Sequence, residues 1–336
     1  MRHWSKGAAL IGLLLASMGV AAAEKLTVYS YRQPFLIDPI LQDFTTKTGI
    51  EVEVVFSKKG IAERIKREGR LSPVDLVLTS DFSRLMEMVD MGLVQPVNSD
   101  TVNNNIPAQF RDPNNQWFAL TSRVRNVYSS KERVGAVDLN YEDLADPKFK
   151  GKICMRQGQH PYNVSLVASM IAHHGEADTE TWLKGVKANL ARKPQGNDRG
   201  QVKAVKEGLC DYAIGNSYYY GKMMQDAEQK TWADAVVLNF PNQSNRGSHI
   251  NVSGVALAKY SANVDNATQL IEYLSSDQAQ QQYAELNMEY PVKADVPVSK
   301  MVASWGEFKA DDLPIQALAD NHAAAVKLLN KVKFDL

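Results

Sequence analysis

The first hundred residues alternate between apolar runs and amphipathic segments, and this alternation limits the fold more than any other feature of the sequence. The runs have the composition of strands, and the segments between them have the apolar spacing of helices. A β-α-β-α-β order is typical of an open parallel sheet with helices on its faces. The predicted strands are residues 26–31, 51–56 and 74–79, and the predicted helices are residues 39–48, 61–70 and 82–91.

Ligands of open parallel sheets bind beyond the carboxyl ends of the strands. Here those ends are residues 29–33, 57–60 and 79–81, and Tyr31 and Gln33 lie in the first of them. We therefore expect these three segments to form one wall of a binding site.

The alternation is interrupted and then restarts, which predicts two lobes. Residues 117–129 form a long extended stretch that is a candidate for a strand crossing between domains, and residues 236–240 and 250–259 are predicted to return the chain. A chain of this length exceeds most single cores. A domain that the chain leaves and re-enters implies lobes joined by extended strands, with the ligand in the cleft at the hinge.

We predict a first lobe of residues 24–125 plus 249–300 and a second lobe of residues 126–248 plus 301–336, after a leader of residues 1–23. The remaining predicted elements share the same strand and helix patterns. The strands are residues 151–156 and 211–215, and the helices are residues 164–173, 179–190, 199–209, 263–275, 277–287 and 315–331.

The leader has the pattern of a secretory signal peptide. Arg2 and Lys6 provide the positive start, residues 7–20 are apolar but too short to span a bilayer, and small residues allow cleavage after Ala23. We therefore expect a protein exported to the periplasm of a Gram-negative bacterium.

Charge and motifs exclude several classes of function. Of 38 basic and 38 acidic residues, the leader carries only Arg2 and Lys6, so 36 basic and 38 acidic residues remain in the mature chain. This balance predicts partners other than nucleic acid or anionic membrane. The sequence has no Gly-x-Ser-x-Gly or His-Glu-x-x-His motif, so we do not expect an enzyme.

The two cysteines, Cys154 and Cys210, each lie in an apolar strand-like run. In an oxidising compartment a pair is more often bridged than free. If the two strands are neighbours, the α-carbons can lie within the roughly 7 Å that a disulfide requires. We predict a disulfide between them.

Three consecutive tyrosines, Tyr218, Tyr219 and Tyr220, follow the predicted strand at residues 211–215, and Ser217 is a predicted N-cap of the helix after them. Neighbouring helix positions face different directions, so the first two phenols can converge while the third is carried round the helix. The rings could simply pack a core. Alternatively, the phenol groups could bind a hard, highly charged cation.

Several ordered segments carry a family resemblance. They resemble periplasmic ferric-iron-binding proteins of the FbpA/FutA type, the substrate-binding components of iron ABC transporters, over nearly the whole mature chain. The resemblance implies a two-lobed α/β fold of the type II periplasmic-binding-protein class, in which each lobe is a mostly parallel sheet flanked by helices and Fe³⁺ lies between the lobes. The segments are residues 29–33, 76–81, 162–169, 192–198, 216–219, 240–243 and 247–254.

The resemblance also assigns a site. The paired iron-binding tyrosines of the family fall on Tyr218 and Tyr219, and a third, in a Tyr-Asn-x-Ser-Leu segment, falls on Tyr162. Where the family often has a His or His-Tyr ligand pair, this chain reads Gln33-Pro34. Tyr31 or Gln33 could approach the metal there, or an anion or water could take the position.

Arg123 and Arg125, with Arg32 as a weaker candidate, lie where the resemblance implies carbonate or another synergistic anion. It further implies an inner-membrane permease and its ATPase as partners of a monomeric receptor. Phenolates suit Fe³⁺ because hard cations favour oxygen donors. A binding protein of the same fold for an oxyanion, a polyamine or thiamine is the alternative.

The histidines are weaker candidates for the site. His173 and His174 end a predicted helix and are expected to be solvated, and His160 is expected at the surface. His249 lies in a stretch predicted to cross between the lobes, so we expect it near the cleft.

Overall fold

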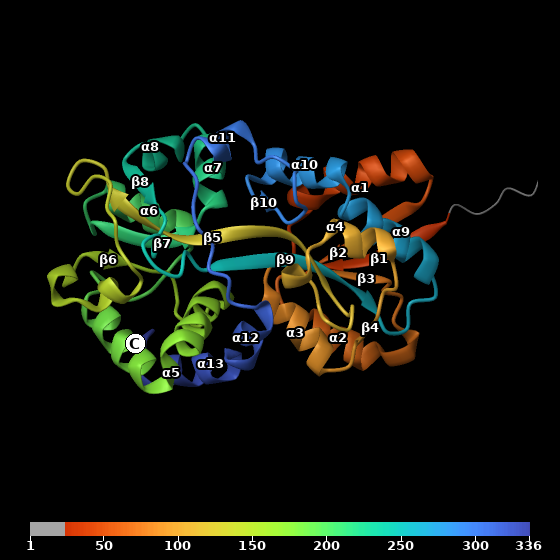
Figure 1. The fold of residues 1–336 in the computed structure, drawn as a ribbon, viewed down its shortest axis with the longest axis horizontal. Helices are drawn as coiled ribbons and strands as arrows, with labels where there is room; N and C mark the ends of the chain where they lie inside the picture. Colours follow the sequence, from red (N-terminus) through yellow and green to blue (C-terminus); the bar gives the residue numbers. More distant parts are fainter. Residues whose placement is uncertain (1–23) are drawn as a thin grey trace, which may run out of the picture.

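The computed structural model describes residues 24–336, which form two α/β lobes placed side by side (Figure 1). The predicted leader and its cleavage after Ala23 lie outside the described residues. Within residues 24–336 no helix is both long and apolar enough to cross a membrane.

The first lobe is built on three parallel strands, with β1 between β2 and β3. All four residues of β3 are buried, as expected for a strand covered on both faces. The lobe contains β1 (Lys25–Ser30), α1 (Pro34–Thr48), β2 (Glu51–Phe56), α2 (Ile61–Glu68), η1 (Gly69–Leu71), β3 (Leu76–Thr79), α3 (Phe82–Asp90), β4 (Val94–Gln95), α4 (Asp100–Asn105), η2 (Ala108–Phe110), α9 (Val264–Leu274) and α10 (Asp277–Asn287).

Two long strands connect the lobes. β5 (Phe118–Ser130) and β9 (Ile250–Ala258) are antiparallel partners from Phe118↔Val255 to Val124↔Ile250. β9 also pairs with β3 of the first lobe, while the second half of β5 pairs with strands of the second lobe. Figure 1 shows both strands extending from one lobe into the other. The predicted crossing strand and its return through residues 250–259 are therefore confirmed. The prediction that residues 236–240 also return the chain is wrong, because they pair only with residues Val127–Ser130 of β5 in the second lobe.

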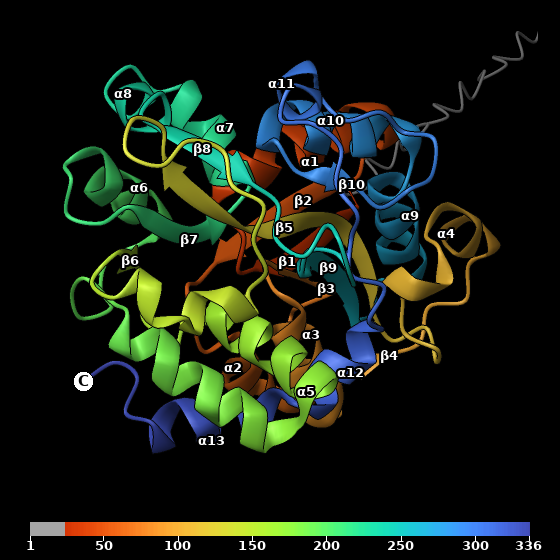
Figure 2. The same ribbon diagram turned by 60° about the vertical axis from the view of Figure 1, so that its left-hand side comes forward.

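In the second lobe, β7 is parallel to β6 and antiparallel to β5. Parallel pairs thus occur at β1–β2, β1–β3 and β6–β7, and the crossing strands add antiparallel pairs, so the sheet is mixed. Helices α5 and α13 pack side by side below it (Figure 2). The lobe contains η3 (Glu142–Ala145), η4 (Pro147–Phe149), β6 (Ile153–Cys154), α5 (Pro161–Ala188), α6 (Asp198–Lys206), β7 (Tyr212–Asn216), α7 (Tyr218–Met224), α8 (Lys230–Ala233), β8 (Val236–Asn239) and α13 (His322–Lys331).

Three short elements near the hinge complete the fold: β10 (Tyr290–Pro291), α11 (Lys300–Ala303) and α12 (Ile315–Asp320). The helix predicted over 315–331 is divided at Asn321 into α12 and α13. The predicted lobe boundaries stay a prediction. Ile315 and Leu318 of α12, although assigned to the second lobe by sequence, are buried in the core of the first.

One other predicted helix limit is wrong, at a proline. α1 begins at Pro34 and continues through Pro39, where the sequence predicted its start. Pro34 suits the first helical position because no N–H is needed there, and Pro39 removes one hydrogen bond without ending the helix. The separation of the helices predicted at residues 164–173 and 179–190 is confirmed, because the non-helical backbone of Gly175 (φ 77°, ψ 170°) divides α5 between them.

The predicted disulfide is confirmed. Cys154 in β6 and Cys210, just before β7, are bonded, with their α-carbons 5.9 Å apart. Because β6 and β7 are parallel neighbours, the bridge fastens together the two strands that precede α5 and α7.

We expect the Cys154→Ser/Cys210→Ser variant to unfold more easily than the wild type. The bridge closes a loop with a sequence separation of 56, and a loop of this size typically contributes about 2–4 kcal/mol to the free energy of unfolding. Thermal or denaturant unfolding of both proteins under non-reducing conditions measures the loss. An unchanged midpoint would contradict the prediction.

Candidate functional site

A cavity of about 500 Å³ lies between the lobes. One wall comes from the carboxyl ends of β1, β2 and β3, as predicted, and includes Tyr31, Arg32, Gln33, Phe56, Lys58, Ser80 and Asp81. The opposite wall comes from the segments that begin α5, α6 and α7, and includes Arg156, His160, Tyr162, Asn197, Arg199, Tyr218 and Tyr219.

Three phenols converge on the second-lobe wall. The Oη atoms of Tyr162 and Tyr218 are 3.2 Å apart, and the ring centres of Tyr218 and Tyr219 are 4.2 Å apart. Tyr162 lies in the first turn of α5, and the other two begin α7. The structure therefore brings together the three tyrosines that the sequence selected, from positions 56 residues apart.

The turn between β7 and α7 is held by the crossing strand. Ser217 occupies the N-cap position, but its side chain does not cap the helix, so the predicted capping is wrong. Its backbone is helical (φ −56°, ψ −43°), whereas a capping side chain needs an extended backbone. The Ser217 hydroxyl instead accepts a hydrogen bond from the Val124 N–H at 3.2 Å.

Tyr220 turns away from the other two phenols, as the helical spacing predicted. Its ring stacks on Tyr128 at a centroid distance of 6.3 Å and meets the edge of Trp305 at 5.8 Å. The next residue, Gly221, allows close packing, because a Cβ there would lie 2.5 Å from Cγ of Met288. The third tyrosine is thus a packing residue that anchors the turn.

Burial keeps Tyr218 and Tyr219 protonated in the absence of a ligand. Desolvation raises the pKa of Tyr218 and Tyr219 well above the usual value of 10, and the neighbouring Tyr162 adds to both rises. The guanidinium of Arg123 acts in the opposite direction on the pKa of Tyr218, and that of Arg156 does so for Tyr219. A cation entering this site must therefore displace protons.

Arg123 carries unused hydrogen-bond donors close to the phenols. Its side chain is 1% exposed, lines the cavity, and lies with its guanidinium carbon 5.9 Å from the ring centre of Tyr162. Among the described residues, its Nε and Nη1 have no hydrogen-bond partner, and the carboxylate of Glu289 is 4.0 Å from Nη1. Glu289 instead pairs closely with Arg32, at 2.7 Å.

Arg125, the other arginine predicted to hold an anion, lies behind the phenols and does not line the cavity. Its Nη1 donates to Asp198 at 2.6 Å and to Asn216 at 3.0 Å, and its Nη2 donates to Asn163 at 2.6 Å. Since protein groups already occupy both terminal nitrogens, the structure gives Arg125 no contact with the cavity.

Tyr31 and Gln33 lie on the first-lobe wall, opposite the three phenols. The Tyr31 hydroxyl accepts a hydrogen bond from the Ile61 N–H at 3.1 Å, and Arg84 lies 3.9 Å from the centre of its ring. Gln33 is exposed just before α1 and makes no capping hydrogen bond.

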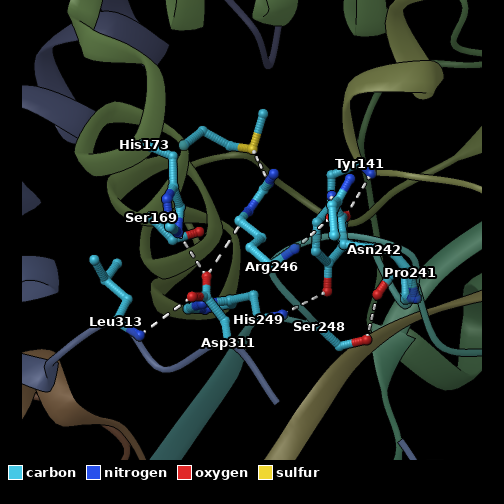
Figure 3. Close-up of polar contacts among 12 residues, drawn as sticks. Tyr141, Ser169, His173, Pro241, Asn242, Arg246, Ser248, His249, Asp311 and Leu313 are labelled. Atoms are coloured by element: carbon cyan, nitrogen blue, oxygen red, sulfur yellow. Dashed lines mark hydrogen bonds and ion pairs between the residues drawn. The ribbon is translucent and has the colours of Figure 1, made fainter. Parts of the chain in front are cut away.

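The histidines occupy three different environments. His160, expected at the surface, lines the cavity edge-on to Tyr162 at 4.5 Å, and burial together with Arg156 lowers its pKa to about 3. His249, expected near the cleft, is buried outside the cavity wall with its Nε2 2.8 Å from Ser165 Oγ. Figure 3 shows it in a polar cluster with His173, whose Nε2 is 2.8 Å from Asp311.

The sequence reasoning missed Asp198, which is fully buried behind the phenols. It follows the N-cap Asn197 and begins α6, so in sequence it is an ordinary acidic residue of a first helical turn. Among residues 24–336, no three His, Cys, Asp or Glu side chains gather as a metal site. The oxygen atoms that converge on the second-lobe wall are instead those of the phenols.

Comparisons with known proteins agree with one another. The model of the family described as bacterial extracellular solute-binding protein matches residues 71–312. Iron uptake protein A1 of Synechocystis sp. is 42% identical over 312 residues, which cover 92% of this chain and 87% of that protein. The crystal structure of apo ferric ion-binding protein A from Pasteurella haemolytica is 55% identical, covers 94% of this chain and 99% of that one, and has a TM-score of 0.90.

A second solved structure, of the Trichodesmium protein (IdiA, FutA) in complex with iron and citrate ligands, is 39% identical. It covers 92% of this chain and 99% of that one, with a TM-score of 0.87. These relatives share the two-lobed architecture over nearly the whole described chain.

Proposed function

The chain belongs to the family of bacterial extracellular solute-binding proteins, and from this premise we propose that it is a periplasmic receptor for Fe³⁺. It captures ferric iron between its lobes and delivers it, as a monomer and without catalysis, to an inner-membrane ABC permease with its ATPase. The observation that carries the proposal is the convergence of three phenols in the interlobe cavity, with the hydroxyls of Tyr162 and Tyr218 3.2 Å apart. The names of the relatives, which include iron uptake and ferric ion-binding proteins, support it.

Tyr162, Tyr218 and Tyr219 are the proposed iron ligands. Fe³⁺ prefers hard oxygen donors, and three phenolates would balance its charge in a cleft without a carboxylate cluster. Tyr31 and Gln33 line the facing wall, so either could complete the coordination when the lobes close. Water or an anion is the alternative occupant of that position.

Arg123 is the proposed holder of a synergistic anion such as carbonate. Its two buried nitrogens without a partner and its position against Tyr162 support this role. Arg125 does not line the cavity and is paired with Asp198, so the proposal no longer includes it.

The charge of the cavity argues against a polyamine as the ligand. Its wall carries more basic than acidic side chains, and a polyamine would need the opposite balance. The basic residues are Arg32, Lys58, Arg84, Arg123, Arg156, Arg199 and Lys222, and the acidic ones are Asp81, Asp226 and Glu289.

The iron-loaded wild type should absorb visible light through tyrosinate-to-iron charge transfer, which polyamine, thiamine and oxyanion complexes do not show. We expect Tyr219→Phe to weaken or shift this band. It should also lower ferric affinity by more than roughly 100-fold, which is the loss that removal of a residue outside the coordination sphere can cause. Tyr220→Phe is the matched control, because Tyr220 faces Tyr128 and not the cavity. A Tyr219→Phe protein with the band and affinity of the wild type would refute the assignment.

Iron affinity should be present at neutral pH and lost as pH falls. Burial raises the pKa of Tyr218 and Tyr219, so these two phenols are protonated without a ligand and each must release a proton when it binds the metal. The logarithm of the affinity should therefore fall by about two for each pH unit, one for each of these two phenols. Titration of the visible band from neutral into mildly acidic buffer measures this slope. In Tyr219→Phe the slope should be smaller by about one, because one proton fewer is released on binding. A pH-independent affinity would rule out phenolate binding.

Arg123→Gln should bind iron more weakly and lose any dependence on added bicarbonate, because it removes the guanidinium that would hold the anion. Lys58→Gln is the control, since Lys58 is an exposed cation on the opposite wall. Ferric titrations with and without bicarbonate give the comparison. If Arg123→Gln keeps the response of the wild type to bicarbonate, the anion lies elsewhere.

A further inference from the structure

Asp198 is a fully buried carboxylate in contact with the segments that carry the phenols. Its Oδ2 accepts hydrogen bonds from Arg125 Nη1 at 2.6 Å and from the Asn216 N–H at 2.9 Å. Its Oδ1 accepts one from Arg156 Nη1 at 3.1 Å. Asn216 is the last residue of β7, two positions before Tyr218.

Arg125 extends these contacts to the segment that carries Tyr162. Its Nη2 donates to Oδ1 of Asn163, the residue after Tyr162, at 2.6 Å. Its Nη1 also donates to Oδ1 of Asn216, at 3.0 Å. The Arg125–Asp198 pair therefore connects the first turn of α5 with the turn that precedes α7.

Both partners of this pair are charged and almost without solvent contact, since Arg125 is 2% exposed and Asp198 is 0% exposed. Burial alone would raise the pKa of the Asp198 carboxyl, but Arg125 and Arg156 hold it below its usual value. A buried ion pair adds little net stability compared with apolar residues of similar size. Its value here lies in the direction and spacing that its hydrogen bonds impose.

We propose that Arg125 and Asp198 are positioning residues, which fix the separation of Tyr162 from Tyr218 and Tyr219 and thereby set the geometry of the metal site. The pair touches neither the cavity nor the metal, and it acts through Asn163 and Asn216. This inference rests on the proposed function, because it describes how the proposed ligands are held.

The test compares Asp198→Asn with Asp75→Asn in the full chain loaded with ferric iron. Asp75 is a matched control: it is 2% exposed and accepts hydrogen bonds from Thr27 N–H at 2.9 Å and Ser261 Oγ at 2.7 Å, but it does not line the cavity. We expect both variants to lose thermal stability. Only Asp198→Asn should also shift or weaken the visible band and lose about 10–100-fold in ferric affinity, the range typical of residues that orient metal ligands.

The Arg125→Gln/Asp198→Asn variant keeps the test decisive if the single variant fails to fold. It removes the buried charge of Arg125 together with that of Asp198 and leaves only Arg156, which is 11% exposed, without its carboxylate, so it should be more stable than Asp198→Asn. The visible band of the double variant should still differ from that of the wild type. Gln lacks the planar guanidinium with which Arg125 bonds Asn163, Asn216 and residue 198 at the same time. Rapid mixing with a chelator gives the iron dissociation rate, which should be faster in both variants than in Asp75→Asn.

The outcomes separate the two proposals. A wild type without a charge-transfer band overturns the proposed function and this inference together. A wild-type band that is retained, with unchanged affinity, in Asp198→Asn or in the double variant overturns only the positioning role and leaves the phenolate site in place.

Discussion

The pairing of β5 with β9 is the constraint on which the rest of the structure depends. β5 leaves β9 at Val124↔Ile250 and enters the second lobe at Arg125↔Asn216, so it changes partner within one residue step. Three consecutive residues at this point reach the site in different ways. Arg123 lines the cavity, Val124 holds Ser217, and Arg125 pairs with Asp198. The strand that joins the lobes therefore also organises the wall that carries the phenols.

The electrostatics of the cleft balance two opposing requirements. Burial favours the neutral forms of Tyr218 and Tyr219, which avoids two charged oxygen atoms close together when no cation is bound. The guanidinium of Arg123 favours the phenolate of Tyr218, and that of Arg156 favours the phenolate of Tyr219. Asp198 offsets part of the charge of Arg125 and Arg156, so the positive charge behind the phenols is reduced.

Local patterns in the sequence were sufficient for much of the fold. Alternating apolar runs predicted the parallel strands, helical spacing predicted that Tyr220 would turn away, and two cysteines on strand-like runs predicted the bridge between Cys154 and Cys210. The proposed ligand tyrosines came from the resemblance, because position 162 lies too far from the tyrosine turn for any local pattern to connect them.

Two departures from the sequence expectations share a physical cause. Arg123 and Arg125 are two residues apart on one strand, so the sequence could not tell which guanidinium would meet a carboxylate. That partner, Asp198, is 73 residues from Arg125, and only the folded sheet brings them together. Ser217 similarly matches an N-cap in sequence, yet its hydroxyl is taken by the N–H of Val124, 93 residues away.

All three converging phenols belong to the second lobe, and this has a mechanical consequence. Tyr162 is fixed through α5 and Tyr218 through β7, and the disulfide and the Arg125–Asp198 pair connect the strands and turns behind them. In the proposed hinge closure the distances among the phenols would therefore stay unchanged, and only their distance from the facing wall of Tyr31 and Gln33 would change. On this proposal the second lobe presents its three phenol oxygens before the lobes close, and closure governs the remaining coordination positions and the access of water.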